Sequence, residues 1–158
     1  MEETENPIDV RPFDSFEEAL KIASILNDCN VTWAFVGGIA VAVHGYIRAT
    51  EDVDVVILLT DLKKIDSALK KEGYIINEEP IKFNDGFELF RRVLIRGSFY
   101  FVLDLLISPE QDGIFEGCLF SKFQNKDVRV ISKSKLLQMK RSAGRPKDIL
   151  DIDALTKG

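Results

Sequence analysis

Apolar residues that recur every three or four positions predict five helices along this chain. The first follows Ser15-Phe16-Glu17-Glu18, a capping box in which the Ser15 hydroxyl and the Glu18 carboxylate would bond early amide donors. Asp61 is expected to cap the third helix, which ends near Gly73. The expected helices are roughly four turns from residue 15, then 38–46, 62 to about 73, 134–142 and 146–155.

Runs of β-branched and aromatic residues between these helices predict strands. Residues 32–36 are typical of a short buried strand. Residues 54–59 are typical of a central strand covered on both faces, because they are apolar apart from one carboxylate. Further strands are expected at 74–77, 88–95 and 99–107, with turns at 84–86 and 97–98, and one or two edge strands within 115–131.

This order of elements predicts an α/β (α+β) fold with a mixed β-sheet flanked by helices. The sheet is expected to be mixed because the hairpins after residue 84 must be antiparallel. No linker, repeat or low-complexity tract interrupts the chain, so residues 1–158 are expected to form a single domain. Residues 1–12 are an irregular lead-in in this interpretation, and residues 133–156 are C-terminal helices packed on the core.

The composition of the chain restricts the possible classes of function less than the pattern of apolar and polar residues does. A net charge of −5 gives no global attraction to nucleic acid or to an anionic membrane. No apolar run reaches the ~20 residues that a membrane span needs, so no membrane partner is expected. Cys29 and Cys118 lie far apart, without metal-ligand or redox spacing, which suits a reducing cytosol. The acidic start lacks the order of a signal peptide, and the interpretation is a cytoplasmic protein.

A glycine pair, Gly37-Gly38, stands where a strand turns directly into a helix. The first amide groups of a helix have no partner within it, and glycine lets a phosphate approach the backbone without meeting a side chain. The pair therefore suits a phosphate site, but by itself it does not establish one. A tight turn without any ligand is the alternative reading of the same two residues.

Two carboxylates, Asp52 and Asp54, begin the apolar strand that follows. Side chains alternate along a strand, so these two point to one face, ~6–7 Å apart, and repel each other unless a cation is present. Mg²⁺ prefers oxygen ligands and usually shares its site with substrate phosphates. The alternative is that Asp52 caps a turn and Asp54 pairs with Arg48.

A third carboxylate, Asp104, lies in the middle of nine otherwise apolar residues. Burying a charge in such a strand is costly unless it is paired or bound to a metal. If this strand lies beside the one that carries Asp54, the three carboxylates meet at one rim. Neutralisation of Asp104 by Arg91, Arg92 or Arg96 of a neighbouring strand is the alternative.

Two further groups of residues have ordinary explanations as well as functional ones. His44, the only histidine, suits a structural role at a turn, although it lies close to the proposed site. Basic residues gather near the C-terminus and could line an RNA groove, but such a run is usually a solvated helix face, and no aromatic residues alternate with them. They are Lys133, Lys135, Lys140, Arg141, Arg145 and Lys147.

The glycine pair, followed by Asp52-Val53-Asp54 and a later Asp104, resembles the nucleotidyltransferase superfamily with the DNA polymerase beta-type palm. Residues 44–54 are most similar to small bacterial and archaeal members, including the AbiEii toxin-like group. The closing run, residues 137–151, resembles that group's final helices. The resemblance covers about residues 15–155.

This resemblance implies a site. Asp52, Asp54 and Asp104 would be catalytic and would bind two Mg²⁺ ions, with Mn²⁺ as a substitute. Gly37 and Gly38 would hold the triphosphate. Arg48, Thr50 and Lys140 would contribute to the same nucleotide-binding side.

The implied activity is transfer of a nucleoside monophosphate from a nucleoside triphosphate such as ATP to a hydroxyl on a small molecule, a protein or an RNA end. Many relatives have Gly-Ser where this chain has Gly37-Gly38, so a hydroxyl contact to phosphate is missing. A catalytically inactive nucleotide-binding or toxin–antitoxin-type interaction module, with a partner protein or as a homo-oligomer, is the alternative function.

Overall fold

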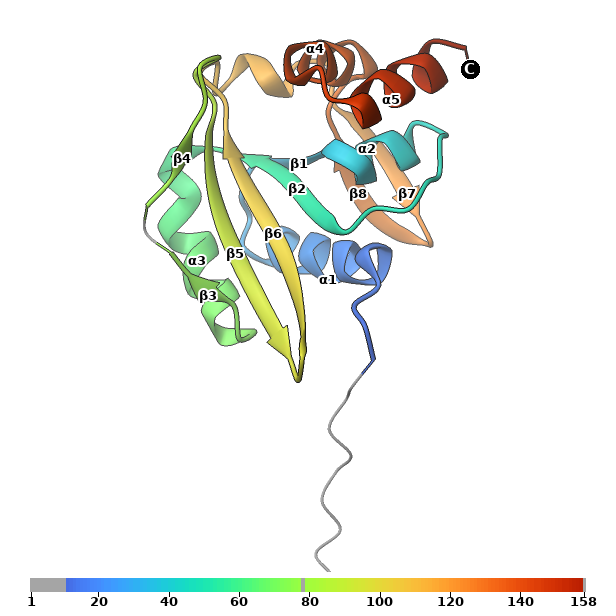
Figure 1. Cartoon of the computed structure of the whole chain (residues 1–158). Helices are drawn as coiled ribbons and strands as arrows, with labels where there is room; N and C mark the ends of the chain where they lie inside the picture. The colour runs from blue at the N-terminus through green and yellow to red at the C-terminus, as the bar shows by residue number, and fades with distance from the viewer. Residues whose placement is uncertain (1–10, 78, 158) are drawn as a thin grey trace, which may run out of the picture.

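In the part of the chain that the computed structural model describes, eight strands form one mixed sheet, accompanied by five α-helices and two short 3₁₀ turns (Figure 1). The structure describes residues 11–77 and 79–157. The helices are α1 (Ser15–Asp28), α2 (Gly37–Val43), α3 (Leu62–Lys71), α4 (Lys133–Ala143) and α5 (Pro146–Lys157), and the 3₁₀ turns are η1 (Leu59–Asp61) and η2 (Gly113–Phe115). The strands are β1 (Trp33–Val36), β2 (Asp52–Ile57), β3 (Ile75–Ile76), β4 (Ile81–Lys82), β5 (Glu88–Arg96), β6 (Phe99–Ile107), β7 (Leu119–Phe123) and β8 (Lys126–Val130).

The sheet has the order β3-β5-β6-β2-β1-β8-β7, with β4 paired to β5 beside β3. The pairs β2–β6 and β1–β8 are parallel, and the other pairs are antiparallel. The centre of the sheet is its most apolar part: all four residues of β1 are buried, and β2 is buried from Val55 to Ile57. The predicted α/β fold with a mixed sheet is therefore confirmed.

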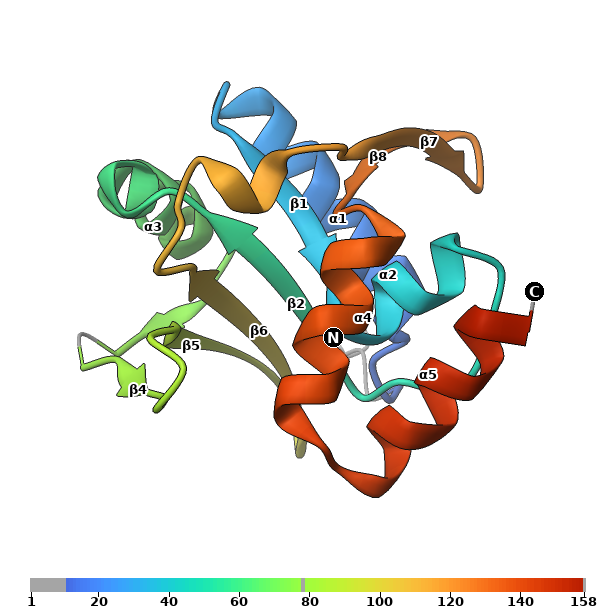
Figure 2. The same ribbon diagram turned by 90° about the horizontal axis from the view of Figure 1, so that it is seen from above.

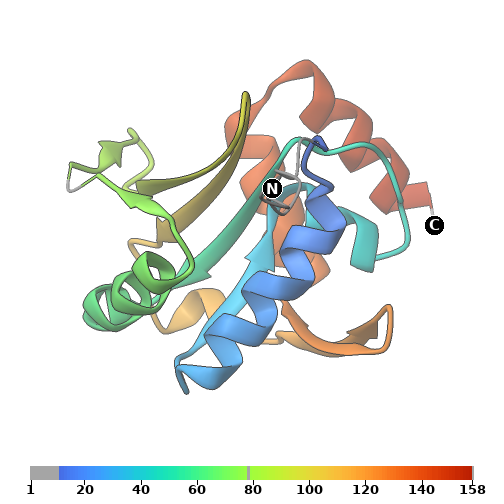
Figure 3. The same ribbon diagram turned by 90° about the horizontal axis from the view of Figure 1, so that it is seen from below.

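Helices α1 and α3 cover one face of the sheet, and α4 and α5 lie on the opposite side (Figures 2 and 3). Two ion pairs show which side chains of β5 point to the face covered by α1 and α3. Arg92 bonds Asp66 of α3, and Arg96 contacts Glu18 of α1. Because side chains alternate along a strand, Arg91 points to the opposite face, on which α4 and α5 lie.

The predicted helices are all present, but two of their caps differ from the prediction. The N-cap of α1 is Asp14, whose carboxylate accepts from the amides of Phe16 and Glu17. Ser15 instead donates its hydroxyl to the carbonyl oxygen of Thr50, 2.7 Å away. Glu18 is buried and pairs with Lys21 and Arg96, so the expected capping box was wrong. Asp61 is the N-cap residue of α3, as predicted, but its side chain makes no cap bond.

The strands follow the predicted ranges, with two differences. β4 was not predicted, since two exposed residues give no readable alternation. β7 is an edge strand as expected, whereas β8 lies inside the sheet between β7 and β1. Most of the predicted lead-in, residues 1–12, lies outside the described residues, and the single domain over 1–158 stays a prediction. Within the described part, every helix is too short or too polar to cross a membrane.

Candidate active site

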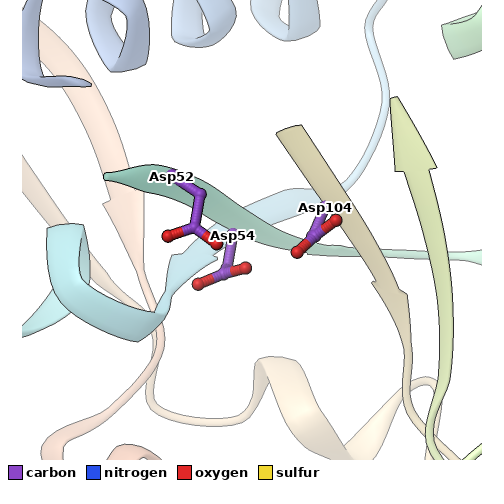
Figure 4. A group of neighbouring side chains, drawn as sticks. All are labelled: Asp52, Asp54 and Asp104. Carbon is purple, nitrogen blue, oxygen red and sulfur yellow. The ribbon is translucent and has the colours of Figure 1, made fainter. Parts of the chain in front are cut away.

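Strands β2 and β6 bring Asp52, Asp54 and Asp104 together, as the sequence predicted. The two strands are parallel neighbours, and the register places Asp54 directly opposite Asp104. Each residue offers one carboxylate oxygen, and these oxygens lie within 4.8 Å of one another. Figure 4 shows the three side chains on the same side of the ribbon. We call these three residues the acidic triad.

The electrostatic cost of this arrangement falls mainly on Asp54. Burial of its carboxylate, followed by the nearby charges of Asp104 and Asp52, raises the pKa of Asp54 from 3.8 to about 7. Lys140 and Lys147 act in the opposite direction but do not cancel this effect. No ion pair to Asp54 or to Asp52 is present among the described residues, and Arg48 pairs with Asp151, so the alternative of an Asp54–Arg48 pair is wrong. The pair of β2 carboxylates is therefore a place where a cation would be stabilising.

Asp104 differs, because it has a cationic partner. Arg91 of β5 lies opposite Asp104 in the antiparallel register and donates to both carboxylate oxygens, from Nε at 2.9 Å and from an NH₂ group at 3.0 Å. The Asp104 side chain is 3 % exposed and that of Arg91 is 48 % exposed. Among the three arginines that the sequence offered, Arg91 is the one on the same face as Asp104. Carboxylate oxygens have further lone pairs, so this bond leaves room for another ligand.

The glycine pair lies against this site, and a side chain at either position would meet close neighbours. Gly37 has a φ of +62°, and a Cβ there would collide with the Asp54 carboxylate. A Cβ on Gly38 would lie 2.7 Å from the hydroxyl oxygen of Thr50 and 3.4 Å from a guanidinium nitrogen of Arg48. No side chain caps α2, so its first amides have no side-chain partner. Bare backbone therefore adjoins the acidic triad.

Solved structures of nucleotidyltransferases share this arrangement of helices and strands. One is the antibiotic-resistance factor ANT(2'')-Ia in complex with adenylyl-2''-tobramycin, at 14 % identity and a TM-score of 0.63, with 90 % of this chain and 87 % of that chain covered. Another is the lincosamide antibiotic adenylyltransferase LnuA, lincomycin-bound, at 18 % identity and a TM-score of 0.65, covering 89 % and 95 %.

A putative nucleotidyltransferase from Thermotoga maritima is also similar, at 13 % identity and a TM-score of 0.61, covering 89 % of this chain and 91 % of that chain. The chain has the nucleotidyltransferase fold. No protein-family model matches the sequence, and no curated protein matches it either. The likeness is thus one of structure at low identity, and the AbiEii-like subgroup has no support from it.

In this nucleotidyltransferase fold, α4 and α5 are joined to the glycine side of the site by a buried ionic cluster. Arg48, in the connection between α2 and β2, donates to both oxygens of Asp151 of α5, each at 2.7 Å. Lys140 of α4 is 5 % exposed and lies 2.9 Å from Asp151 and 3.2 Å from Asp148. Arg145 also bonds Asp148. We call these five residues the helix-anchoring cluster.

The cluster holds the side chains of Arg48 and Lys140 in ion pairs with Asp148 and Asp151. Burial opposes ionisation of Asp148 and Asp151, but the hydrogen bonds from Arg145, Arg48 and Lys140 outweigh it and hold the pKa of both carboxyls below the usual value. The Asp151 pairing was missed because the two partners are 103 residues apart. A buried Asp151 at helical spacing from Asp148 was the signal that could have found it.

The other candidates have structural partners. The His44 ring nitrogen Nε2 lies 2.9 Å from the carbonyl oxygen of Ile131, which ties the end of α2 to the chain after β8. Within the predicted basic set, Lys140 and Arg145 are engaged in the helix-anchoring cluster.

Proposed function

We propose that this protein is a divalent-metal-dependent nucleotidyltransferase. The observation that carries the proposal is the acidic triad, with oxygens within 4.8 Å of one another beside bare glycine backbone. The likeness to nucleotidyltransferase structures supports the same reading. Asp52, Asp54 and Asp104 are the proposed catalytic residues.

The chemistry of the triad fits a pair of hard divalent cations, Mg²⁺ or Mn²⁺. All three residues supply carboxylate oxygens, which these ions prefer. The raised pKa of Asp54 reflects a cost that such cations would remove. When bound, two such ions would stabilise the attacking and leaving oxygens of an in-line displacement at phosphorus. Asp52 and Asp54 would hold both ions, and Asp104 would complete the site nearer the acceptor.

The triphosphate would lie on the glycine side of the triad. Gly37 and Gly38 present backbone amides there, and Thr50 and Arg48 lie against Gly38. Lys140 would act from within the helix-anchoring cluster, by fixing Asp151 and hence Arg48, and by adding positive charge near the site. In the reaction the acceptor oxygen forms a bond to the α-phosphorus, the bond to pyrophosphate breaks, and the hydroxyl proton passes to water.

A nucleotidyl transfer assay tests this proposal. Purified protein would be incubated with Mg²⁺, one labelled nucleoside triphosphate at a time, and small hydroxyl compounds, proteins or short RNAs as acceptors. We expect pyrophosphate release and a labelled acceptor, with a loss of at least 100-fold in Asp54→Asn. The matched control is Asp127→Asn, an exposed carboxylate on β8. A protein that neither binds nor consumes any triphosphate would refute the proposal.

A non-catalytic nucleotide-binding or toxin–antitoxin-type module is the second candidate. One observation favours it: Arg91 already neutralises Asp104 by bonding both of its oxygens. Titration with a triphosphate, with and without Mg²⁺, separates the two functions. Binding that is unaffected by Asp52→Asn and Asp54→Asn would favour the non-catalytic module. Its partner protein or homo-oligomer, the AbiEii-like subgroup and a cytoplasmic location stay proposals that rest on the sequence.

A further inference from the structure

An open pocket of about 400 Å³ lies on the sheet next to the acidic triad. It is formed by β3, β4 and β5 together with Asn77 and Glu79, which lie between β3 and β4. Its lining residues are Ile75, Asn77, Glu79, Ile81, Arg91 and Val93. In Figure 2 helices α4 and α5 lie over the other half of the sheet and leave this half without a helix above it.

The pocket and the triad share one face of the sheet. Val93 is two residues after Arg91 on β5, so their side chains point the same way, and Ile75 of β3 is paired with Val93. Arg91 connects the two regions, because it lines the pocket and bonds Asp104. A molecule bound in the pocket would therefore lie beside Asp104, the triad carboxylate on β6.

The walls of the pocket define the kind of molecule that it suits. Ile75 and Ile81 are 54 % and 46 % exposed, which is unusual for isoleucine and leaves an apolar surface for a ligand to cover. A volume of this size is in the range of small-molecule sites, roughly 300–1,000 Å³. It is far smaller than the groove that an RNA strand or a folded protein would need.

The charges around the pocket disfavour an anion. Arg91 is its one cation, and its charge is already balanced by Asp104. Glu79 is exposed and lines the pocket, and it forms no ion pair with any residue in the ranges 11–77 and 79–157, so its charge is available to a ligand. With Arg91 balanced by Asp104, Glu79 is the unbalanced charge among these lining residues, and the carboxylates of Asp52 and Asp54 near Asp104 add to the negative potential.

We infer that the pocket binds the acceptor, and that the acceptor is a small molecule with an apolar body, a hydroxyl group and a cationic amine that pairs with Glu79. This inference rests on the proposed function, because an acceptor exists only if the protein transfers a nucleotidyl group. The apolar body covers Ile75, Ile81 and Val93, and the hydroxyl points toward Asp104. RNA ends and acidic compounds are disfavoured by the same charges.

The test uses three matched probes and no nucleotide. They are 4-(aminomethyl)benzyl alcohol, 4-methylbenzyl alcohol and 4-(hydroxymethyl)benzoate, which share a ring and a hydroxyl and differ in charge. Binding is followed at millimolar probe concentration and low salt by the NMR shifts of the isoleucine and valine methyl groups. We expect shifts at Ile75, Ile81 and Val93, and roughly two- to fivefold tighter binding of the amine than of the neutral alcohol, as for an exposed ion pair. The carboxylate should bind more weakly than both.

Two variants separate the charge effect from the apolar one. Glu79→Gln should remove the preference for the amine and leave binding of the neutral alcohol unchanged, whereas Asp127→Asn on β8 should change neither. The inference is overturned if no probe shifts these methyl groups, if the carboxylate binds as tightly as the amine, or if a short single-stranded RNA displaces the amine. Pocket binding without any triphosphate turnover would count against the proposed function and leave the pocket standing.

Discussion

Replacing Asp54 by asparagine is expected to stabilise the metal-free protein, although it removes a proposed catalytic residue. The pKa of Asp54 is about 7 in the folded chain, against 3.8 for an ordinary aspartate. Below pH 3.8 the carboxyl is protonated in both the folded and the unfolded states and contributes nothing. As the pH rises from 3.8 toward 7, the unfolded state ionises first, so the folded state loses stability. Above pH 7 this loss is complete.

The size of the effect follows from the two pKa values. One pKa unit corresponds to about 1.4 kcal/mol, so the full cost is about 4 kcal/mol, with roughly 1.5 kcal/mol already present at pH 5. Asp54 is partly exposed, and water screens part of this cost. We therefore expect Asp54→Asn to gain about 2–4 kcal/mol at pH 8, or roughly 5–15 °C in Tm for a chain of this length.

Urea unfolding in EDTA at pH 5 and pH 8 measures this gain. Asp153→Asn serves as the control, because Asp153 is exposed on α5 and pairs only with Lys157 there; its change should stay below about 0.5 kcal/mol. Adding Mn²⁺ at pH 8 should stabilise the wild-type protein and leave Asp54→Asn unchanged. A gain of the same size at both pH values, or no gain at pH 8, would refute the electrostatic reasoning.

Three further predictions concern the backbone, the acid limit and the covered face of the sheet. Gly37→Ala should destabilise the folded protein by at least about 1 kcal/mol, because φ is +62° and the new methyl group collides with the triad. The same variant should bind Mn²⁺ more weakly in titration calorimetry, and an unchanged Mn²⁺ affinity would contradict this. The stability contributed by ionised Asp148 and Asp151 is complete above about pH 3.8 and should be lost as the pH falls through their lower native pKa values. Urea unfolding midpoints measured at decreasing pH should show this loss in the wild-type protein and not in the double asparagine variant. Arg92→Ala should cost about 3–5 kcal/mol in urea unfolding, since it leaves Asp66 unpaired; a cost below 1 kcal/mol would contradict the role of this pair.

The sequence predicted the central strands and the long helices because local pattern is sufficient there. β2 and β6 are runs of apolar residues interrupted by carboxylates, and that combination suggested both a buried strand and a site. The parallel pairing of β2 with β6 was stated only as a condition for the site. The structure fulfils that condition through the register of Asp54 with Asp104.

The features that could not be predicted depend on contacts between distant segments. Ser15 is not the cap of α1 because its hydroxyl donates to the carbonyl oxygen of Thr50, 35 residues away. Arg48 pairs with Asp151 rather than with the nearby Asp54, because α5 returns over the connection that carries Arg48. Selecting Arg91 among three arginines required the β5–β6 register, which decides the side of the sheet on which each one lies.

Charge compensation across the molecule explains why Asp54 stands apart. Within the described part of the chain, each buried carboxylate has a basic partner: Glu18 has Lys21 and Arg96, Asp104 has Arg91, Asp148 has Lys140 and Arg145, and Asp151 has Arg48 and Lys140. An unpaired buried charge costs several kcal/mol, so such pairing is what folding stability alone would select. Asp54 is partly buried, carries the raised pKa and has Gly37 against it in place of a basic side chain. Within the described residues, the chain thus leaves the two β2 carboxylates, and Asp54 above all, to be neutralised from outside, at the point where backbone can approach a phosphate.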